Sequence, residues 1–289
     1  MKTMGDKNRE LIVMPDDGLE AVLRAVEGAG RSLDIKMFLF SEPALVAAVI
    51  AAHRRGVKTR VMLNPARRSG ESENVETQSA LISAGVEVRD TNPAFAVTHE
   101  KTMVVDGCQA LIKSMNWTPK NFTHTRDYAV VTADPPEVAE VEACFDADWD
   151  RTEFNGRNAR LIWCPGDGRG RIARFIDETR DHLELQNERY QDPTIIERLV
   201  RARERGVRIR LMSPPPHALK EKKLLEGVNG LRIFRDVGIK HLHHTFAHDW
   251  DDSHQRDLSD EGIRMDLEKH GLEDGGSLAL NVTTEKMRE

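Results

Sequence analysis

Cysteine is scarce in this chain, which has three cysteines among its 289 residues. Cys108, Cys144 and Cys164 are odd in number, and no two of them have the C-x-x-C spacing of thiolate metal ligands. This pattern disfavours both a disulfide framework and a cysteine-based zinc site. We therefore expect buried, reduced thiols in a cytosolic protein.

Long hydrophobic runs are also missing. The longest apolar stretch, residues 44–52, ends in His-Arg-Arg and is far shorter than the roughly 20 residues that a membrane-spanning helix needs. The first 18 residues have no sustained apolar core, so the sequence predicts no secretory signal peptide. We expect no transmembrane segment and a cytoplasmic location, with peripheral contact to a membrane left open.

An excess of positive charge is absent as well. The chain carries 42 basic and 48 acidic side chains, which gives a net charge of −6. A protein that coats nucleic acid needs a surplus of lysine and arginine facing phosphates, so that class is disfavoured, although a local basic site is not. The remaining composition, 39% hydrophobic and 31% charged, is that of an ordinary soluble protein.

The sequence does contain an internal repeat. A shift of 150 residues aligns three stretches without a gap: 11–18 with 161–168, 32–43 with 182–193, and 54–65 with 204–215. Identical pairs include Pro15/Pro165, Gly18/Gly168, Pro43/Pro193, Gly56/Gly206 and Arg60/Arg210. A register kept over this length is typical of two fused copies of one domain. We predict domains at 9–155 and 158–289, joined in the polar stretch EFNGRN.

Each copy alternates strand patterns with helix patterns. In the first copy the predicted strands are 11–14, 33–40, 57–63, 85–89, 102–105, 110–114 and 128–132. Amphipathic helices are predicted at 17–30, from Pro43 to Gly56, and on the apolar positions Val138, Val141, Phe145 and Trp149. This β-α-β-α-β order predicts an α/β fold, with two tandem α-β-α sandwich domains and mixed, largely parallel sheets.

The stretch HEKTMVVD, residues 99–106, and the segment after it carry the candidate chemistry. His99 and Lys101 project to one face of an extended chain, because the side chains of a strand alternate. Ser114 and Asn116 share a face in the same way on the neighbouring segment. Together they could gather an imidazole, an ammonium, a hydroxyl and an amide around one anion.

The combination is far more specific than any of its members. H-x-K-x4-D followed by S-x-N resembles the signature of the phospholipase D superfamily. His99, Lys101, Asp106, Ser114 and Asn116 match that signature in type and spacing. The chain looks most like bacterial phospholipase D and cardiolipin synthase relatives, so the resemblance implies two phospholipase D-like domains.

The resemblance also implies a mechanism. The family cleaves phosphodiesters without a metal or other cofactor: the histidine of one copy attacks phosphorus and forms a phosphohistidine, and the histidine of the other copy protonates the leaving alkoxide. By this resemblance His99 is a catalytic histidine, Lys101 and Asn116 bind the phosphate oxygens, and Ser114 adds a hydrogen bond. Asp106 is expected to orient the site rather than to react.

Two positions near the motif leave alternatives open. In the family an acidic residue further along hydrogen-bonds the nucleophilic histidine; Asp127 is the candidate here, although it could equally be a surface charge at a strand edge. Lys113 stands where the family has glycine. Its side chain could point away from the site, which we favour, add a phosphate contact, or impair the site.

The second copy does not keep the motif. A shift of 145 residues places His244 opposite His99 and Asp251 opposite Asp106, but Phe246 replaces the lysine and no G-S-x-N follows. Three interpretations compete. His244 or its neighbour His243 still supplies the acid, or the segment has diverged, for example through a reading-frame change, and leaves an impaired half-site.

The third interpretation is a metal site in residues 241–254, which hold five histidines beside several aspartates. No fixed ligand spacing such as H-E-x-x-H supports it, so no metal is predicted.

The sequence therefore predicts a phosphodiesterase, with a phospholipid as the expected substrate and with hydrolysis or transfer both open. A nuclease of the same superfamily is one alternative, for which Arg67 and Arg68 are suggestive. A catalytically impaired binding or scaffold protein is the alternative from another class. The chain would act as a monomer, or as a homodimer that combines one motif from each subunit.

Overall fold

The structure is a computed structural model that describes residues 8–66, 72–156, 159–214, 240–242 and 269. The chain divides into two compact units between Leu161 and Ile162. The domain limits expected from the sequence, 9–155 and 158–289, stay predictions.

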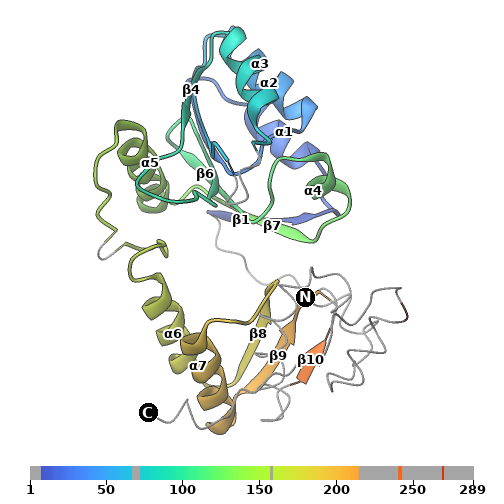
Figure 1. The fold of residues 1–289 in the computed structure, drawn as a ribbon, viewed down its shortest axis with the longest axis vertical. Helices are drawn as coiled ribbons and strands as arrows, with labels where there is room; N and C mark the ends of the chain where they lie inside the picture. Colours follow the sequence, from blue (N-terminus) through green and yellow to red (C-terminus); the bar gives the residue numbers. More distant parts are fainter. Residues whose placement is uncertain (1–7, 67–71, 157–158, 215–239, 243–268, 270–289) are drawn as a thin grey trace. The chain divides into compact units, whose positions relative to one another are not determined.

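The first unit is built on a seven-stranded sheet in the order β1-β7-β6-β5-β2-β3-β4 (Figure 1). Its strands are β1 Arg9–Met14, β2 Ser32–Met37, β3 Lys58–Leu63, β4 Glu87–Asp90, β5 Lys101–Val105, β6 Gln109–Lys113 and β7 Asp127–Thr132. Its helices are α1 Glu20–Glu27, α2 Pro43–Arg54, α3 Val75–Ser83, α4 Pro119–Thr123 and α5 Pro135–Asp150. Helices α3 and α4 were not predicted from the sequence.

The sheet is mixed, as predicted, but it is not largely parallel. Only β2, β3 and β4 are parallel neighbours. The other four neighbouring pairs, β2–β5, β5–β6, β6–β7 and β7–β1, are antiparallel. The reason is visible in the chain: residues 106–108 join β5 to β6, and a parallel pair needs a crossover of about a dozen residues.

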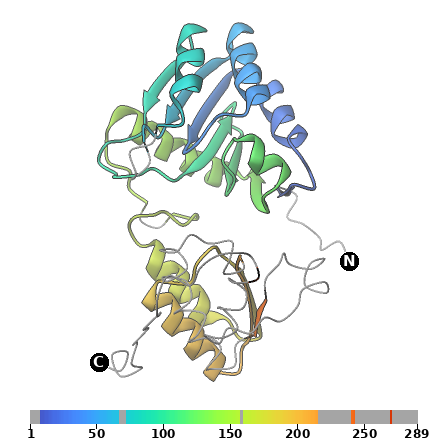
Figure 2. The ribbon, with the colours of Figure 1, turned by 45° about the vertical axis from the view of Figure 1, so that its right-hand side comes forward.

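Helices cover both faces of this sheet, which confirms the α-β-α sandwich (Figures 1 and 2). One face packs against α1 to α4 in a core that includes Val26, Leu45, Leu81 and Phe122. On the other face Phe145 and Trp149 of α5 pack on Met62 of β3. Side chains that alternate along β2 and β5 therefore enter two different layers.

The second unit repeats part of this plan. It contains α6 Gly168–Glu178, β8 His182–Gln186, α7 Pro193–Glu204, β9 Arg208–Met212 and β10 Lys240–Leu242, with a parallel sheet in the order β10-β9-β8. β8, α7 and β9 begin 150 residues after β2, α2 and β3. The spacing of the sequence repeat thus reappears in three consecutive elements. The core of this unit includes Ile176, Leu183, Leu199 and Leu211.

Two further expectations concern the burial of the cysteines and the lack of a transmembrane segment. All three cysteines are free, but only Cys144 is buried; Cys108 and Cys164 are exposed, because each lies in a turn. The expectation of buried thiols was therefore wrong for two of the three. In the ranges that the structure describes, no helix is long and apolar enough to cross a membrane.

Candidate active site

Five of the predicted site residues lie at one edge of the seven-stranded sheet, the edge at which β5 and β7 begin and β6 ends. His99 precedes β5 and Lys101 begins it, Ser114 and Asn116 follow β6, and Asp127 begins β7. Because β6 is antiparallel to both β5 and β7, its end lies beside their beginnings. The sheet topology thus brings together residues from three separate strands.

His99 and Lys101 are held against the same aromatic ring. His99 is exposed, and its ring centroid lies 4.6 Å from that of Phe38, with the planes tilted by 55°. Lys101 is only 4% exposed; its Nζ donates a hydrogen bond to the His99 carbonyl and lies 5.1 Å from the Phe38 centroid. The imidazole is therefore presented at the surface, with the amine beneath it.

Burial sets the electrostatics of Lys101. Desolvation lowers the pKa of its amine to about 8, although the negative charges of Asp127 and Glu100 act in the opposite direction. At neutral pH the amine is still mostly protonated. An anion that binds beside the buried Lys101 ammonium would be attracted more strongly than one beside an exposed lysine, because less solvent screens the two charges.

Asp127 is the centre of a hydrogen-bond network. Ser114 Oγ donates to Oδ1 over 2.8 Å, while Asn121 Nδ2 and Thr125 Oγ1 donate to Oδ2 over 3.0 and 2.7 Å. Ser114 Oγ also accepts a 2.9 Å hydrogen bond from the amide of Tyr128. Sequence reasoning missed Asn121 and Thr125; their closeness to a candidate acid was the available signal.

Asn116 has an acceptor that the described part of the chain does not satisfy. The residue is half-buried, its Oδ1 is buried, and no described group donates a hydrogen bond to that atom. Buried polar atoms normally have partners, so this amide lies where a ligand or an ordered water would complete it.

Lys113 does not point away from the site, contrary to the favoured expectation. The register that pairs Thr102 with Ile112 places Lys113 directly opposite Lys101, so the two side chains share a face of the sheet. Lys113 is 7% exposed, and burial lowers the pKa of its amine to about 7, with Glu100 raising it and Lys101 lowering it further. Two amines therefore lie side by side at this edge.

Asp106 is not brought to the site. It follows β5 at the opposite edge of the sheet, where its carboxylate accepts hydrogen bonds of 2.6 to 3.2 Å from the backbone amides of Gly30, Arg31 and Ser32. Asp106 is five residues further along the chain than Lys101, which is about 17 Å at the usual rise of a strand. Asp106 thus joins the end of β5 to the start of β2 and does not orient the site directly.

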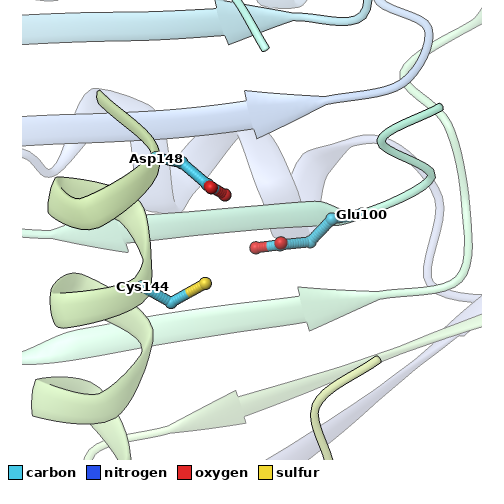
Figure 3. A group of neighbouring side chains, drawn as sticks. All are labelled: Glu100, Cys144 and Asp148. Carbon is cyan, nitrogen blue, oxygen red and sulfur yellow. The ribbon is translucent and has the colours of Figure 1, made fainter. Parts of the chain in front are cut away.

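A buried polar cluster lies behind the site, between the sheet and α5. Glu100, Cys144 and Asp148 point toward one another, with ligand atoms within 4.8 Å (Figure 3). The Lys36 ammonium lies 3.1 Å from Glu100, 3.7 Å from the Cys144 sulfur and 2.6 Å from Asp148. These donors could bind a metal, but the ammonium already supplies the positive charge that they need.

The cluster fixes its own protonation states. Burial, with Glu100, raises the pKa of the Cys144 thiol to about 12, so it stays protonated. Burial alone would lower the pKa of Lys36, but the carboxylates of Glu100 and Asp148 raise it above the ordinary range. Glu100 belongs to both layers: its side chain enters the cluster, and its backbone connects His99 to Lys101.

The second predicted half-site lies outside the described residues. His243, His244 and Asp251 fall in the part of the chain that is not described, and so do Arg67 and Arg68. Their roles stay predictions.

Comparisons with known proteins agree with this geometry. A family model described as "Cardiolipin synthase, PLD-like domain" matches residues 22–149, which include all five residues at the sheet edge. The mitochondrial cardiolipin hydrolase of Xenopus laevis is 32% identical over 135 residues, 47% of this chain and 62% of that protein. The human mitochondrial cardiolipin hydrolase is 31% identical over 141 residues, 48% of this chain and 53% of that protein.

These matches cover only part of each relative, between about half and three fifths of its length. Among solved structures, polyphosphate kinase from Porphyromonas gingivalis superimposes with a TM-score of 0.61 at 20% identity, over 72% of this chain and 38% of that one. This likeness concerns the fold alone. The match of the family model and the relatives in sequence, together with the H-x-K segment at the edge of its sheet, show that the domain at residues 22–149 belongs to the phospholipase D superfamily.

Proposed function

We propose that this protein is a phosphodiesterase of the phospholipase D type, in which His99 attacks the phosphorus of a phospholipid. One observation carries the proposal: an exposed imidazole, a buried amine and an unsatisfied amide lie together at one sheet edge. The position of this edge in a phospholipase D superfamily domain supports the same chemistry.

In the first step, a ring nitrogen of His99 forms a bond to phosphorus while the bond from phosphorus to the leaving alcohol breaks. The leaving alkoxide takes a proton from an acid, for which His244 is the candidate from the second copy. Lys101 attracts the two non-bridging oxygens, and the Asn116 amide lies beside them. Imidazole suits nucleophilic and acid–base roles because its pKa is near neutrality.

In the second step, a water molecule gives a proton to the same group, now a base, and its oxygen bonds to phosphorus. The phosphorus–nitrogen bond breaks and His99 is restored. An alcohol in place of water would give transfer instead of hydrolysis. Neither step uses a metal ion, so the proposed reaction proceeds in the presence of a chelator.

The Asp127 network supports the edge on which this chemistry takes place. Its negative charge raises the pKa of Lys101 against the effect of burial and so favours the ammonium form. Ser114 is bound to Asp127 and to the Tyr128 amide, so in the proposed site it orients this carboxylate as well as facing the phosphate.

The substrate class is argued from the relatives. Two matched proteins are named cardiolipin hydrolases, and the matching family model carries the name of cardiolipin synthase. A diacylated phosphodiester such as cardiolipin is therefore the first substrate to test.

The test uses cardiolipin vesicles with EDTA and measures phosphatidic acid by mass spectrometry. We expect turnover by the wild type, and a loss of at least about 100-fold in His99→Ala, because a nucleophile is removed. His182→Ala is the matched control, since His182 is an exposed histidine at the start of β8; it should keep full turnover.

Other results decide between the alternatives. Turnover that needs a metal and survives His99→Ala would falsify the mechanism. Cleavage of single-stranded DNA without cleavage of lipid identifies a nuclease instead. If the wild type cleaves neither substrate, the result favours a binding or scaffold member of the superfamily.

A further inference from the structure

Lys113 is a buried amine that the fold does not pair. Its Nζ is buried and has no hydrogen-bond partner among the described residues, and it lies 4.9 Å from the ring centroid of Trp117. Trp117 is itself fully buried, and its indole Nε1 also lacks a described partner. An aromatic face attracts a cation, but it accepts no full hydrogen bond.

Lys36 offers a direct comparison within the same domain. It is also fully buried, but two carboxylates, Glu100 and Asp148, lie within 3.1 Å of its ammonium. Buried lysines usually need such partners because burying a lone charge costs much free energy. Among the residues that the structure describes, one buried lysine therefore has two carboxylates in contact with it, and the other, at the site edge, has none.

The charged groups around Lys113 come from the two neighbouring strands. Lys101 lies directly opposite on β5, beside Glu100, and Asp127 begins β7 on the other side. Asp127 is already held by hydrogen bonds from Ser114 and two further side chains. Glu100 raises the pKa of Lys113 through its charge, but in the described part of the chain no carboxylate forms a hydrogen bond or an ion pair with the Lys113 amine.

We propose that Lys113 is a second amine of the anion site, and that it takes up a proton from solvent when a phosphodiester monoanion binds beside Lys101. The inference rests on the proposed function, since it concerns the same site. Without an anion, two ammonium groups on facing strands repel each other in a desolvated place. The bound anion offsets that repulsion, so the second amine becomes charged.

The direction of the pH dependence follows from this coupling. Without ligand, the pKa of Lys113 is about 7, so the amine loses its proton as pH rises through neutrality. An anion favours the charged form and raises that pKa, so binding must strengthen as pH falls. A rise of one unit corresponds to a tenfold gain in affinity below pH 7, which vanishes by about pH 9.

The probe is dimethyl phosphate, a phosphodiester that does not itself titrate in this range. Its binding is measured by isothermal titration with EDTA between pH 6 and 9, in two buffers of different ionisation enthalpy, to count protons. We expect the wild type to bind about tenfold more tightly than Lys113→Met at pH 6 and about equally at pH 9. Near pH 7.5 the variant should take up less than half as many protons.

Two further variants make the test decisive. Lys58→Met removes an exposed lysine at the start of β3, at the opposite edge, and should behave as the wild type. Lys113→Gly, which installs the residue typical of the family, should lose the coupling as Lys113→Met does. Circular dichroism confirms that each variant is folded.

Each remaining outcome counts against the inference. If Lys113→Met and Lys113→Gly keep the wild-type pH dependence and proton uptake while the lipid is still cleaved through His99, Lys113 is not part of the anion site and only this inference fails. If the wild type does not bind dimethyl phosphate at any pH, the inference fails as well. Loss of the proposed function would be seen separately, as lipid turnover that survives His99→Ala.

Discussion

Lys101 and Asp106 belong to one short motif, yet they work at opposite ends of the same strand. Lys101 begins β5 at the candidate site, and Asp106 follows β5 at the far edge, with a left-handed φ of 55°. Three backbone amides converge on its carboxylate. The spacing of the motif therefore reflects the length of a strand: one end carries candidate site residues, and the other end is joined to β2 by hydrogen bonds.

Asp106→Ala should lower stability and spare the chemistry. It removes the acceptor of three amides and forces alanine into a left-handed conformation, which together cost about 2 kcal/mol. Urea denaturation measures this loss. Turnover of the folded variant at low temperature should stay close to that of the wild type.

Asp106→Asn is the matched control, because asparagine tolerates the left-handed region and keeps one acceptor. Partial burial would raise the pKa of Asp106, but the amides of Ser32, Gly30 and Arg31 lower it. Because the pKa of Asp106 is lower in the folded protein, its carboxylate stabilises the fold at pH values above the ordinary pKa of aspartate. This stabilisation is lost as the pH falls through the pKa of the folded state. As the pH falls below the ordinary aspartate range, the stabilities of the wild type and Asp106→Asn should therefore approach each other. Loss of turnover without loss of stability in Asp106→Ala would contradict this role.

At the level of elements, β5 separates two layers with different tasks. His99 and Lys101 face the site layer, while Glu100 enters the polar cluster under α5. Cys144 and Asp148 are one turn apart on α5, so they present their groups to the same point. The helix therefore does more than cover the sheet, because it holds the residue between the two site residues.

Lys36→Met tests this second layer. Without the Lys36 ammonium, the buried Asp148 and the half-buried Glu100 keep hydrogen bonds from Asn92 and Thr102 but lose their counterion. Loss of one partner of a buried ion pair costs about 3–5 kcal/mol. Urea denaturation at pH 7 should show a loss of this size. The triple variant Lys36→Met/Glu100→Gln/Asp148→Asn, which also removes the charges, should recover part of it. A single variant as stable as the wild type would show that the cluster is not charged as described.

At the scale of the whole molecule, each unit has its own buried apolar cluster. Among the described residues, the clusters of the first unit lie between Ile12 and Trp149, and the cluster of the second unit lies between Ile176 and Leu211. The C-terminal end of the first unit is held against α5 by Glu140, which accepts hydrogen bonds from the backbone amides of Arg160 and Leu161. The natural end of that unit is therefore Leu161.

Residues 1–161 should accordingly fold without the second unit. Their far-ultraviolet circular dichroism should be that of an α/β protein, and thermal unfolding should be one cooperative transition, because the core is complete. A fragment that ends at Arg151, before the Glu140 contacts, is the control and should melt at a lower temperature. A non-cooperative melt of 1–161 would mean that the units depend on each other.

Most strands and helices of the first unit, and the candidate site residues, could be predicted from the sequence. Alternation and periodicity located β1 to β7 and the helices α1, α2 and α5, and the repeat anticipated that β8, α7 and β9 follow β2, α2 and β3 by 150 residues. The H-x-K and S-x-N residues were found by spacing. These features are local, and local spacing survives in the chain as written. Helix α4, with five residues, was too short to show a periodic pattern.

Strand direction and burial, which the spacing of residues in the sequence does not reveal, were decided by the tertiary structure. Strand direction is set by pairing between distant segments, and it placed Lys113 opposite Lys101 and left Asp106 at the other edge. Burial likewise depends on what packs above a residue: it gives Lys36 two carboxylates and leaves Lys113 with an aromatic ring. The sequence alone named the groups, and only the packed sheet determined which of them share an edge and in what charge state.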